Sequence, residues 1–281
     1  MRVGRARIQD REYWGEILGD QFVPISTNCL EDLMGKRGLR RLMSVPLSEA
    51  TLLAPAPTPK KLICIGLNYR DHCEEQNIPI PTKPVVFAKF PSAISGPLDT
   101  VDYPLETSQL DFEVELAVVI GSPGRSITPS AAMDHVFGYT VFNDLSARDV
   151  QFADGQWTRG KSFPGFGPMG PWIVTADELP DPQNLDLDLS VNGVFLQRSN
   201  TRHMIFGVAE IISYVSQLGL EAGDVIATGT PAGCGAFRDP QVFLRPGDTV
   251  IASVTGIGSL RNSIVDVRAA VGGPDRKEPN A

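Results

Sequence analysis

Acidic and apolar residues alternate between Leu110 and Leu116, and this is the stretch of the sequence best placed to do chemistry. Successive side chains of a β-strand point to opposite faces, so Asp111, Glu113 and Glu115 would share one face. Carboxylates about 7 Å apart on a strand of core composition are costly unless they stay hydrated or share a cation. The alternative is a solvated face of an antiparallel sheet, since such strands are common.

Two neighbouring features favour a bound metal over a solvated face. The apolar run at 116–120 is typical of a strand buried on both faces, so we expect the acids at the entrance to this buried strand and not on an exposed ribbon. Another acid, Asp144, follows a second strand-like run at 137–143. Because no Cys or His is adjacent, the carboxylates favour a hard cation such as Mg²⁺, Mn²⁺ or Ca²⁺ over zinc.

A candidate proton carrier follows the short apolar strand predicted at 62–65. If the residues after it are helical, His72 and Glu75 are neighbours at i and i+3, and the carboxylate can orient one imidazole nitrogen. A surface histidine beside ordinary acids is the alternative. The chain has only three histidines, however, and the other two, His135 and His203, lie in amphipathic contexts that favour structural roles.

Two loops offer groups for an anionic ligand. Gln151 precedes a long Gly- and Pro-rich stretch, and Lys161 lies within it. Residues of such loops can meet a ligand, although a solvated loop lysine is commoner. The stretch T-G-T-P-A-G-C-G at 228–235 lacks the G-K-[ST] ending of a nucleotide-binding loop, so we exclude nucleotide binding. Its backbone amides and Thr230 could cradle a carboxylate, or it is simply a tight turn.

Composition limits the class of protein. The 281 residues are 42% hydrophobic, enough for a core, and the formal charge of −8 argues against binding nucleic acid. The four cysteines form no C-x-x-C pair, which suits reduced thiols. We find neither an apolar signal core at the N-terminus nor a window near 18 apolar residues, so we expect a cytoplasmic protein without membrane contact.

Four segments organise the chain. Strand-like pieces at 5–8, 17–18 and 22–23 and a helix near 30–34 predict a small N-terminal domain at 1–53, followed by a Pro-rich, extended linker at 54–61. Residues 62–268 form the predicted metal-binding catalytic domain, and 269–281 a disordered tail. Within the catalytic domain, Asn192-Gly193 predicts a hairpin, and helical spacing at 205–218 ends at Gly219, a C-terminal cap.

Taken together, the motifs resemble those of the fumarylacetoacetate hydrolase family over roughly residues 60 to 268. They are G-L-N-Y-R-D-H, D-F-E-V-E-L, G-Y-T-V-F-N-D-L-S-A-R-D-V-Q, G-K-S-F, V-N-G and G-D-V-I-A-T-G-T-P-A-G. The run H-C-E-E-Q-N is similar to the domain-2-like subgroup. The resemblance implies an α+β, mostly β fold, a mixed β-sandwich roll with a small N-terminal domain, and a homodimer.

The same resemblance implies a set of site residues. One Mg²⁺ or Mn²⁺ would be held by Glu113, Glu115 and Asp144. His72 and Glu75 would form a base dyad on a lid that orders over the substrate, and Lys161 would be the third catalytic residue. The substrate would contact Arg70, Gln151 and Thr230. Pro164 departs from the family, because many relatives carry Asp there.

The implied function is divalent-metal-dependent hydrolysis of a C–C bond in acylpyruvate-type 2,4-diketo acids, with a small anionic 2-keto acid as substrate. The same groups serve oxaloacetate enol–keto tautomerisation, oxaloacetate decarboxylation or isomerisation of a 2-hydroxy-diene-dioate, because each reaction passes through an enolate. A metal-stabilised anion-binding protein is the alternative that involves no catalysis.

Overall fold

The computed structural model describes residues 1–27, 29–35 and 39–266. The tail predicted at 269–281 and the end of the predicted catalytic domain lie outside these residues. The strands are β1 Arg2–Ile8, β2 Arg11–Leu18, β3 Gln21–Ile25, β4 Val45–Pro46, β5 Thr51–Leu53, β6 Leu62–Gly66, β7 Val85–Lys89, β8 Ile94–Ser95, β9 Val101–Tyr103, β10 Leu110–Asp111, β11 Val114–Ile120, β12 Val136–Asn143, β13 Ser146–Ala147, β14 Gly167–Thr175, β15 Asp186–Val191, β16 Val194–Asn200, β17 Val225–Ala227, β18 Thr249–Val254 and β19 Gly258–Asp266. The α-helices are α1 Leu30–Gly35, α2 Arg70–Glu75, α3 Arg148–Asp154, α4 Thr158–Lys161 and α5 Val208–Val215.

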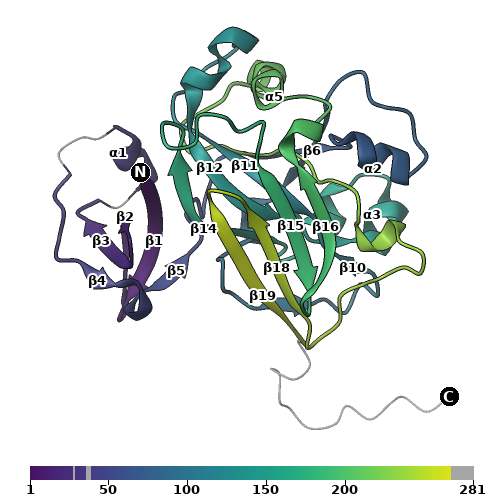
Figure 1. Cartoon of the computed structure of the whole chain (residues 1–281), viewed down its shortest axis with the longest axis horizontal. Helices are drawn as coiled ribbons and strands as arrows, with labels where there is room; N and C mark the ends of the chain where they lie inside the picture. Colours follow the sequence, from purple (N-terminus) through teal and green to yellow (C-terminus); the bar gives the residue numbers. More distant parts are fainter. Residues whose placement is uncertain (28, 36–38, 267–281) are drawn as a thin grey trace.

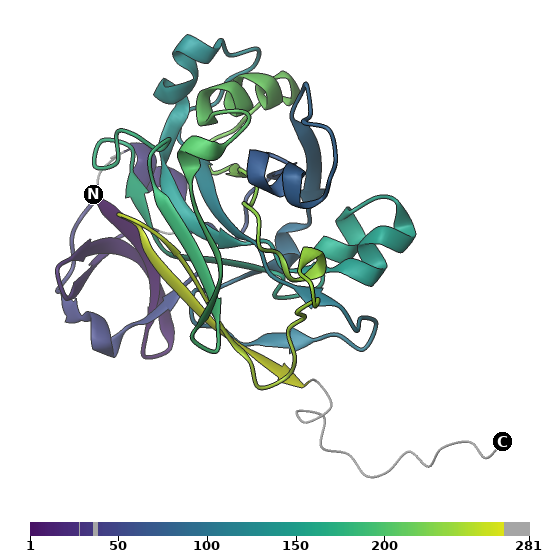
Figure 2. The ribbon, with the colours of Figure 1, turned by 45° about the vertical axis from the view of Figure 1, so that its right-hand side comes forward.

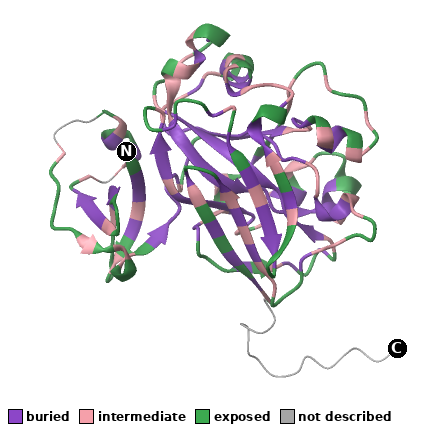
Figure 3. Cartoon of the chain, viewed as in Figure 1, coloured by how far each residue is buried: buried purple, intermediate pink, exposed green. Residues whose placement is uncertain are grey.

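A large mixed sheet runs through the molecule in the order β4-β3-β2-β1-β14-β12-β11-β17-β6-β7 (Figure 1). Its centre is the antiparallel pair β11 and β12, and β17 pairs in parallel with β6. Every residue of β11 is buried, so the strand predicted at 116–120 is confirmed as core on both faces (Figure 3). The pair β11 and β12 therefore forms the base on which the predicted acids Glu115 and Asp144 lie.

A second sheet, in the order β16-β15-β18-β19-β9, covers one face of the first (Figure 2). Leu187 and Leu189 of this sheet lie in one buried cluster with Val114 and Leu116 of the first. In β15, Leu187 and Leu189 are buried and the alternating Asp186 and Asp188 are more exposed, as expected for a strand that packs one face on the core. The β15–β16 turn has positive φ at both Asn192 (51°) and Gly193 (83°), which confirms the predicted hairpin.

Helix α5 and a following 3₁₀ turn, Ser216–Leu218, carry the helical spacing seen in the sequence. The buried side of α5 joins the main core through Ile211, Ile212 and Val215. Gly219 follows at φ 74°, where a residue with a Cβ is disfavoured, as expected for a C-terminal cap.

The N-terminal strands β1 to β5 form a small module beside the main body, and β1 pairs antiparallel with β14 (Figure 1). This pairing makes the module a continuation of the large sheet. It also has a small apolar cluster of its own, centred on Ala6, Ile17, Phe22 and Leu52. The residues that follow are packed against the body, because Ala54 and Ala56 are buried.

Among the described helices, none combines the length and apolar character needed to cross a membrane.

Candidate active site

A cluster of three buried carboxylates forms where β11 and β12 meet. Glu115 lies in β11, Glu113 precedes this strand, and Asp144 follows β12. The register pairs Val114 with Asn143, and the Asp144 N–H donates to the Glu113 carbonyl at 2.9 Å, so the ladder itself brings the acids together. One oxygen from each carboxylate lies within 4.8 Å of the others.

The first acid of the stretch at 110–116, Asp111, is not part of this cluster. The stretch is not one continuous strand, because β10 ends at Asp111 and β11 begins at Val114. Asp111 instead accepts hydrogen bonds from Arg148 Nε at 2.8 Å and from the N–H groups of Gly235 and Ala236 at 2.7 and 3.0 Å. Asp111 and Glu113 accept from the same guanidinium, as expected for side chains on one face, but Asp111 lies outside the group of three acids that could hold one ion.

The charge and the ligand types of the cluster suit a cation. Burial raises the pKa of the Glu115 carboxyl well above its ordinary value, and the charges of Asp144 and Glu113 raise it further. Its Oε2 accepts the Gly229 N–H at 2.8 Å. A Cβ on Gly229 would lie 2.8 Å from Asn68 Cβ, so only glycine allows this approach. Three carboxylates without a sulfur or nitrogen donor suit a hard divalent ion, which can replace the proton.

Three buried cationic side chains form ion pairs with Glu113 and Asp144 of the cluster. Lys161 Nζ donates to Glu113 Oε2 at 2.7 Å and to Asp144 Oδ2 at 2.8 Å, and Lys89 donates to Asp144 Oδ1. Arg148 Nη2 donates to Glu113 Oε1 at 2.6 Å. Burial alone would raise the pKa of Glu113, but Lys161 and Arg148 outweigh it and lower this pKa to about 2.

Lys89 and Arg148 are site residues that the sequence reasoning missed. Lys89 ends β7 on the same side as Phe87, and the alternation of the strand was the signal that this lysine points inward. Arg148 begins α3, inside the motif that carries Asp144, but nothing in the sequence showed which acids it reaches. The sequence favoured a solvated lysine at position 161, yet Lys161 ends helix α4 and is only 2% exposed.

His72 and Glu75 meet in helix α2 as predicted. His72 Nδ1 lies 3.0 Å from Glu75 Oε2, and the other Glu75 oxygen accepts the Gly233 N–H at 2.9 Å. A carboxylate only accepts hydrogen bonds, so Nδ1 carries the proton and Nε2 keeps its lone pair. Nε2 lies 2.7 Å from Gln76 Nε2, and the Phe237 ring packs edge-on at 5.5 Å.

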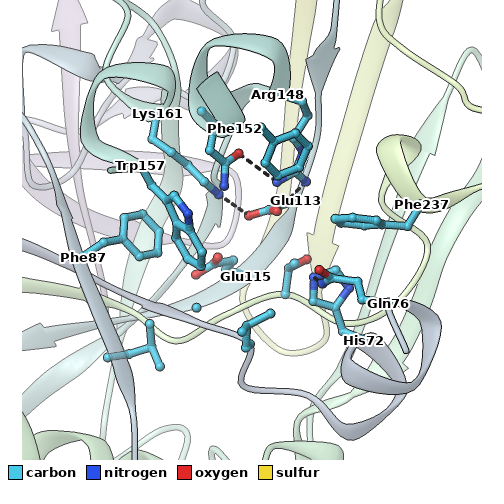
Figure 4. A pocket seen from close by; sticks show the side chains of 15 residues that line it. His72, Gln76, Phe87, Glu113, Glu115, Arg148, Phe152, Trp157, Lys161 and Phe237 are labelled. Atoms are coloured by element: carbon cyan, nitrogen blue, oxygen red, sulfur yellow. Dashed lines mark hydrogen bonds and ion pairs between the residues drawn. The ribbon is translucent and has the colours of Figure 1, made fainter. Parts of the chain in front are cut away.

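A cleft of about 430 Å³, open solvent at its mouth included, joins the dyad to the carboxylates. In Figure 4, Glu113 lies between Lys161 and Arg148, with His72 and Gln76 across the cleft beside Phe237. The described residues that line it are Ile65, Gly66, Leu67, His72, Gln76, Phe87, Glu113, Glu115, Arg148, Gln151, Phe152, Trp157, Lys161, Thr230 and Phe237.

The structure brings most of the predicted substrate contacts to this cleft. Gln151 lines it with its Oε1 held by Arg148 Nη1 at 3.1 Å, which leaves the Gln151 amide nitrogen for a ligand. Thr230 also lines the cleft, and its hydroxyl donates to the Val114 carbonyl at 3.0 Å. Arg70 is exposed and is not among the lining residues.

Buried acids and cations therefore line this cleft together with the His72 imidazole. The family model for the fumarylacetoacetate (FAA) hydrolase C-terminal domain matches residues 61–265. This chain therefore belongs to the fumarylacetoacetate hydrolase family and is one of its enzymes.

Within the family the chain falls in the domain-2-like subgroup. It is 49% identical over 228 residues to the mitochondrial oxaloacetate tautomerase FAHD2B of Bos taurus, covering 80% of this chain and 73% of that protein. Among solved structures, a 2-hydroxyhepta-2,4-diene-1,7-dioate isomerase from Mycobacterium marinum is 37% identical with a TM-score of 0.82, covering 95% and 99% of the two chains. The fumarylacetoacetate hydrolase of Exiguobacterium antarcticum is 39% identical with a TM-score of 0.85, at the same coverage.

Proposed function

We propose that this chain catalyses the enol–keto tautomerisation of oxaloacetate, with a divalent cation held by Glu113, Glu115 and Asp144. The sequence alone ranks hydrolysis of an acylpyruvate first and tautomerisation second. The names of the relatives support the opposite order, because the bovine relative is named a tautomerase and the Mycobacterium marinum neighbour an isomerase. The Exiguobacterium antarcticum hydrolase keeps C–C bond hydrolysis as the competing activity to test.

The observation that carries the proposal is the orientation of His72. Its Nδ1–H is committed to Glu75, so the Nε2 lone pair is the basic atom at the cleft. In the keto direction, Nε2 takes the hydroxyl proton from the C2 oxygen and leaves the O–H electron pair on that oxygen. This pair becomes the carbonyl bond as the electron pair of the C2–C3 double bond takes the same proton at C3. No water is consumed and no C–C bond breaks.

The buried cations of the chain prepare the site for a dianionic substrate. A divalent ion, when bound, supplies Lewis-acid stabilisation of the negative charge that develops at the C2 oxygen. Lys161 keeps Glu113 and Asp144 pointing at one place, because it donates to both. Gln151, held through its oxygen by Arg148, offers its amide N–H groups to a substrate carboxylate. The apolar rings of Phe87 and Trp157 reduce the access of water to the cleft.

The test is a rate measurement with enol-oxaloacetate as substrate. Loss of the enol absorbance is followed with the protein treated with EDTA and then with Mg²⁺, Mn²⁺ or Ca²⁺ restored, and the spontaneous rate is subtracted. We expect acceleration that EDTA abolishes and a divalent ion restores. Production of pyruvate and loss of an acylpyruvate are measured in parallel, because these report decarboxylation and hydrolysis.

Two outcomes would overturn the proposal. Cleavage of the acylpyruvate faster than ketonisation of oxaloacetate would restore the hydrolase interpretation. No acceleration of ketonisation with any of the ions would remove the tautomerase assignment altogether. The cytoplasmic location and the homodimer expected from the sequence stay predictions, and the bovine relative is named as mitochondrial.

A further inference from the structure

A second group of potential metal ligands lies beside the carboxylate cluster and differs from it in chemistry. His72, Glu113 and Cys234 each offer one ligand atom, and these atoms all lie within 4.8 Å of one another. All three side chains are buried, with Cys234 at 0% exposure. Only Glu113 is common to both groups. An imidazole, a carboxylate and a thiol make a set for a borderline-soft ion, whereas Mg²⁺ prefers oxygen alone.

The spacing of these atoms suits one ion. Two ligand atoms on a tetrahedral Zn²⁺, with bonds of about 2.0 and 2.3 Å, lie about 3.5 Å apart. Cys234 Sγ lies 3.9 Å from Glu113 Oε1, so a shift of a few tenths of an ångström would place both on the same ion. Arg148 uses one lone pair of this Oε1 at 2.6 Å and leaves the second one available.

The histidine is already oriented as a metal-bound histidine would be. Ligating histidines usually donate their other ring N–H to a carboxylate or carbonyl, which fixes the ring and the tautomer. Glu75 does this for His72 Nδ1, so Nε2, which Gln76 Nε2 contacts at 2.7 Å, is the atom left to bind the ion. The Gly233 N–H holds Glu75 in place, and Gly233 directly precedes Cys234. One short turn therefore positions two of the ligands.

Among the described residues, the Cys234 thiol makes only long contacts. The contacts of Cys234 Sγ are long, at 3.7 Å to Gln197 Nε2 and 3.9 Å to both the Pro231 carbonyl and Glu113. A coordinating thiol is deprotonated by the ion it binds, and the proton leaves to water.

We propose that His72, Glu113 and Cys234 form a second site that binds a thiophilic divalent ion such as Zn²⁺ and thereby switches the enzyme off. Binding at this site occupies the Nε2 lone pair and engages Glu113, which is also a ligand of the carboxylate cluster. Gln76 gives up its 2.7 Å contact with Nε2 when the ion enters. The inhibitory part rests on the proposed tautomerase function, whereas the binding part does not depend on it.

Binding is tested with Co²⁺, which reports a thiolate ligand through a charge-transfer band and tetrahedral geometry through its visible bands. Co²⁺ is titrated into the full chain in the presence of excess Mg²⁺. We expect a thiolate band that Zn²⁺ abolishes, and that is missing in Cys234→Ala and Cys234→Ser. The matched control is Cys64→Ala, which removes a fully buried thiol near the carboxylates but outside the ligand set and should keep the band.

Inhibition is tested by titrating Zn²⁺ into the ketonisation assay, with each variant compared with its own uninhibited rate. Losing the hydrogen-bond partner of a ligand costs about 10–100-fold in metal affinity, so losing the Cys234 ligand itself should raise the Zn²⁺ midpoint by at least about 10-fold. A thiolate band that survives in both Cys234 variants would overturn the site. An unchanged Zn²⁺ midpoint in those variants would overturn the switch, because Zn²⁺ would then act at the carboxylates. If no ketonisation is found, the Co²⁺ band still decides the binding site.

Discussion

Replacing His72 by Ala should separate the work of the proton carrier from that of the carboxylate cluster. A positioned acid–base group contributes about 10²–10⁴-fold in rate, and we expect a loss of this size in ketonisation of enol-oxaloacetate. Mg²⁺ affinity should stay unchanged, because the hard-cation cluster consists of Glu113, Glu115 and Asp144. The fold should also survive, since the imidazole lies at the wall of a cleft.

Two substitutions of Glu75 sharpen this prediction because they should differ in severity. Glu75→Ala removes a hydrogen bond of 3.0 Å to His72 Nδ1. Hydrogen bonds to charged groups are worth about 1.5–3 kcal/mol, so the rate should fall by about 10- to 150-fold. The base keeps its usable lone pair in this variant, although its orientation is lost.

Glu75→Gln should be the more damaging change, although it keeps the shape of the side chain. The Gly233 N–H donates to Glu75 Oε1 at 2.9 Å and would hold the amide oxygen of glutamine there. The amide NH₂ would then face His72 Nδ1 and require a lone pair on it, which moves the ring proton to Nε2. A protonated Nε2 cannot accept the substrate proton, so the loss should approach that of His72→Ala.

The assay is the decay of enol absorbance at saturating Mg²⁺, with circular dichroism for the fold and calorimetric Mg²⁺ titration for the metal. A wild-type rate in His72→Ala would refute the dyad. Faster ketonisation by Glu75→Gln than by Glu75→Ala would show that the tautomer reasoning is wrong, even if His72 is the base.

Three further predictions concern the ion cluster. Glu115→Gln removes a ligand charge but keeps the shape, so calorimetry should show a sharp fall in Mg²⁺ affinity with an unchanged dichroism spectrum. Because burial and neighbouring acids raise the pKa of Glu115, a proton competes with the ion below that pKa. Mg²⁺ affinity should therefore rise with pH up to the folded pKa and then level off, and Glu115→Gln should lose that part of the pH dependence. Lys89→Met leaves buried Asp144 without one of its cations and should lower the free energy of unfolding by about 3–5 kcal/mol in urea titrations. Saturating Mg²⁺ should restore more stability to this variant than it adds to the wild type, whereas equal gains would place the ion away from Asp144.

The sequence predicted those parts of the fold whose signals are local. Alternation, turn residues and helical spacing lie within a few positions of each other, so the hairpin at Asn192-Gly193 and the helix ending at Gly219 were confirmed. The break before Glu113 was not predicted, because a strand and a strand with a two-residue interruption can carry the same alternation.

The partners of the acids were beyond local signals. Lys89 reaches Asp144 across 55 positions, and Lys161 reaches Glu113 across 48. Any of the 25 Lys and Arg residues could in principle pair with these acids, and only the order of strands in the sheet decides which ones do. Burial of a lysine is also rare enough that composition favours a solvated side chain. The motif resemblance named Lys161 but was silent on Lys89 and Arg148.

The ion network also explains how a cation can enter without a large rearrangement of the chain. Like charges brought this close in a buried site repel, yet Lys161 bridges Glu113 and Asp144 and so offsets their repulsion independently of any bound ion. Glu115 has no such cation in hydrogen-bond contact among the described residues, and burial together with the charges of Asp144 and Glu113 raises the pKa of its carboxyl, which favours the protonated form. An incoming divalent ion therefore exchanges with one proton at Glu115 while the other two ligands are already in place. The energetic cost of assembling the site is met during folding, mainly by the buried pairs with Lys89, Arg148 and Lys161, so little reorganisation remains for the moment of binding.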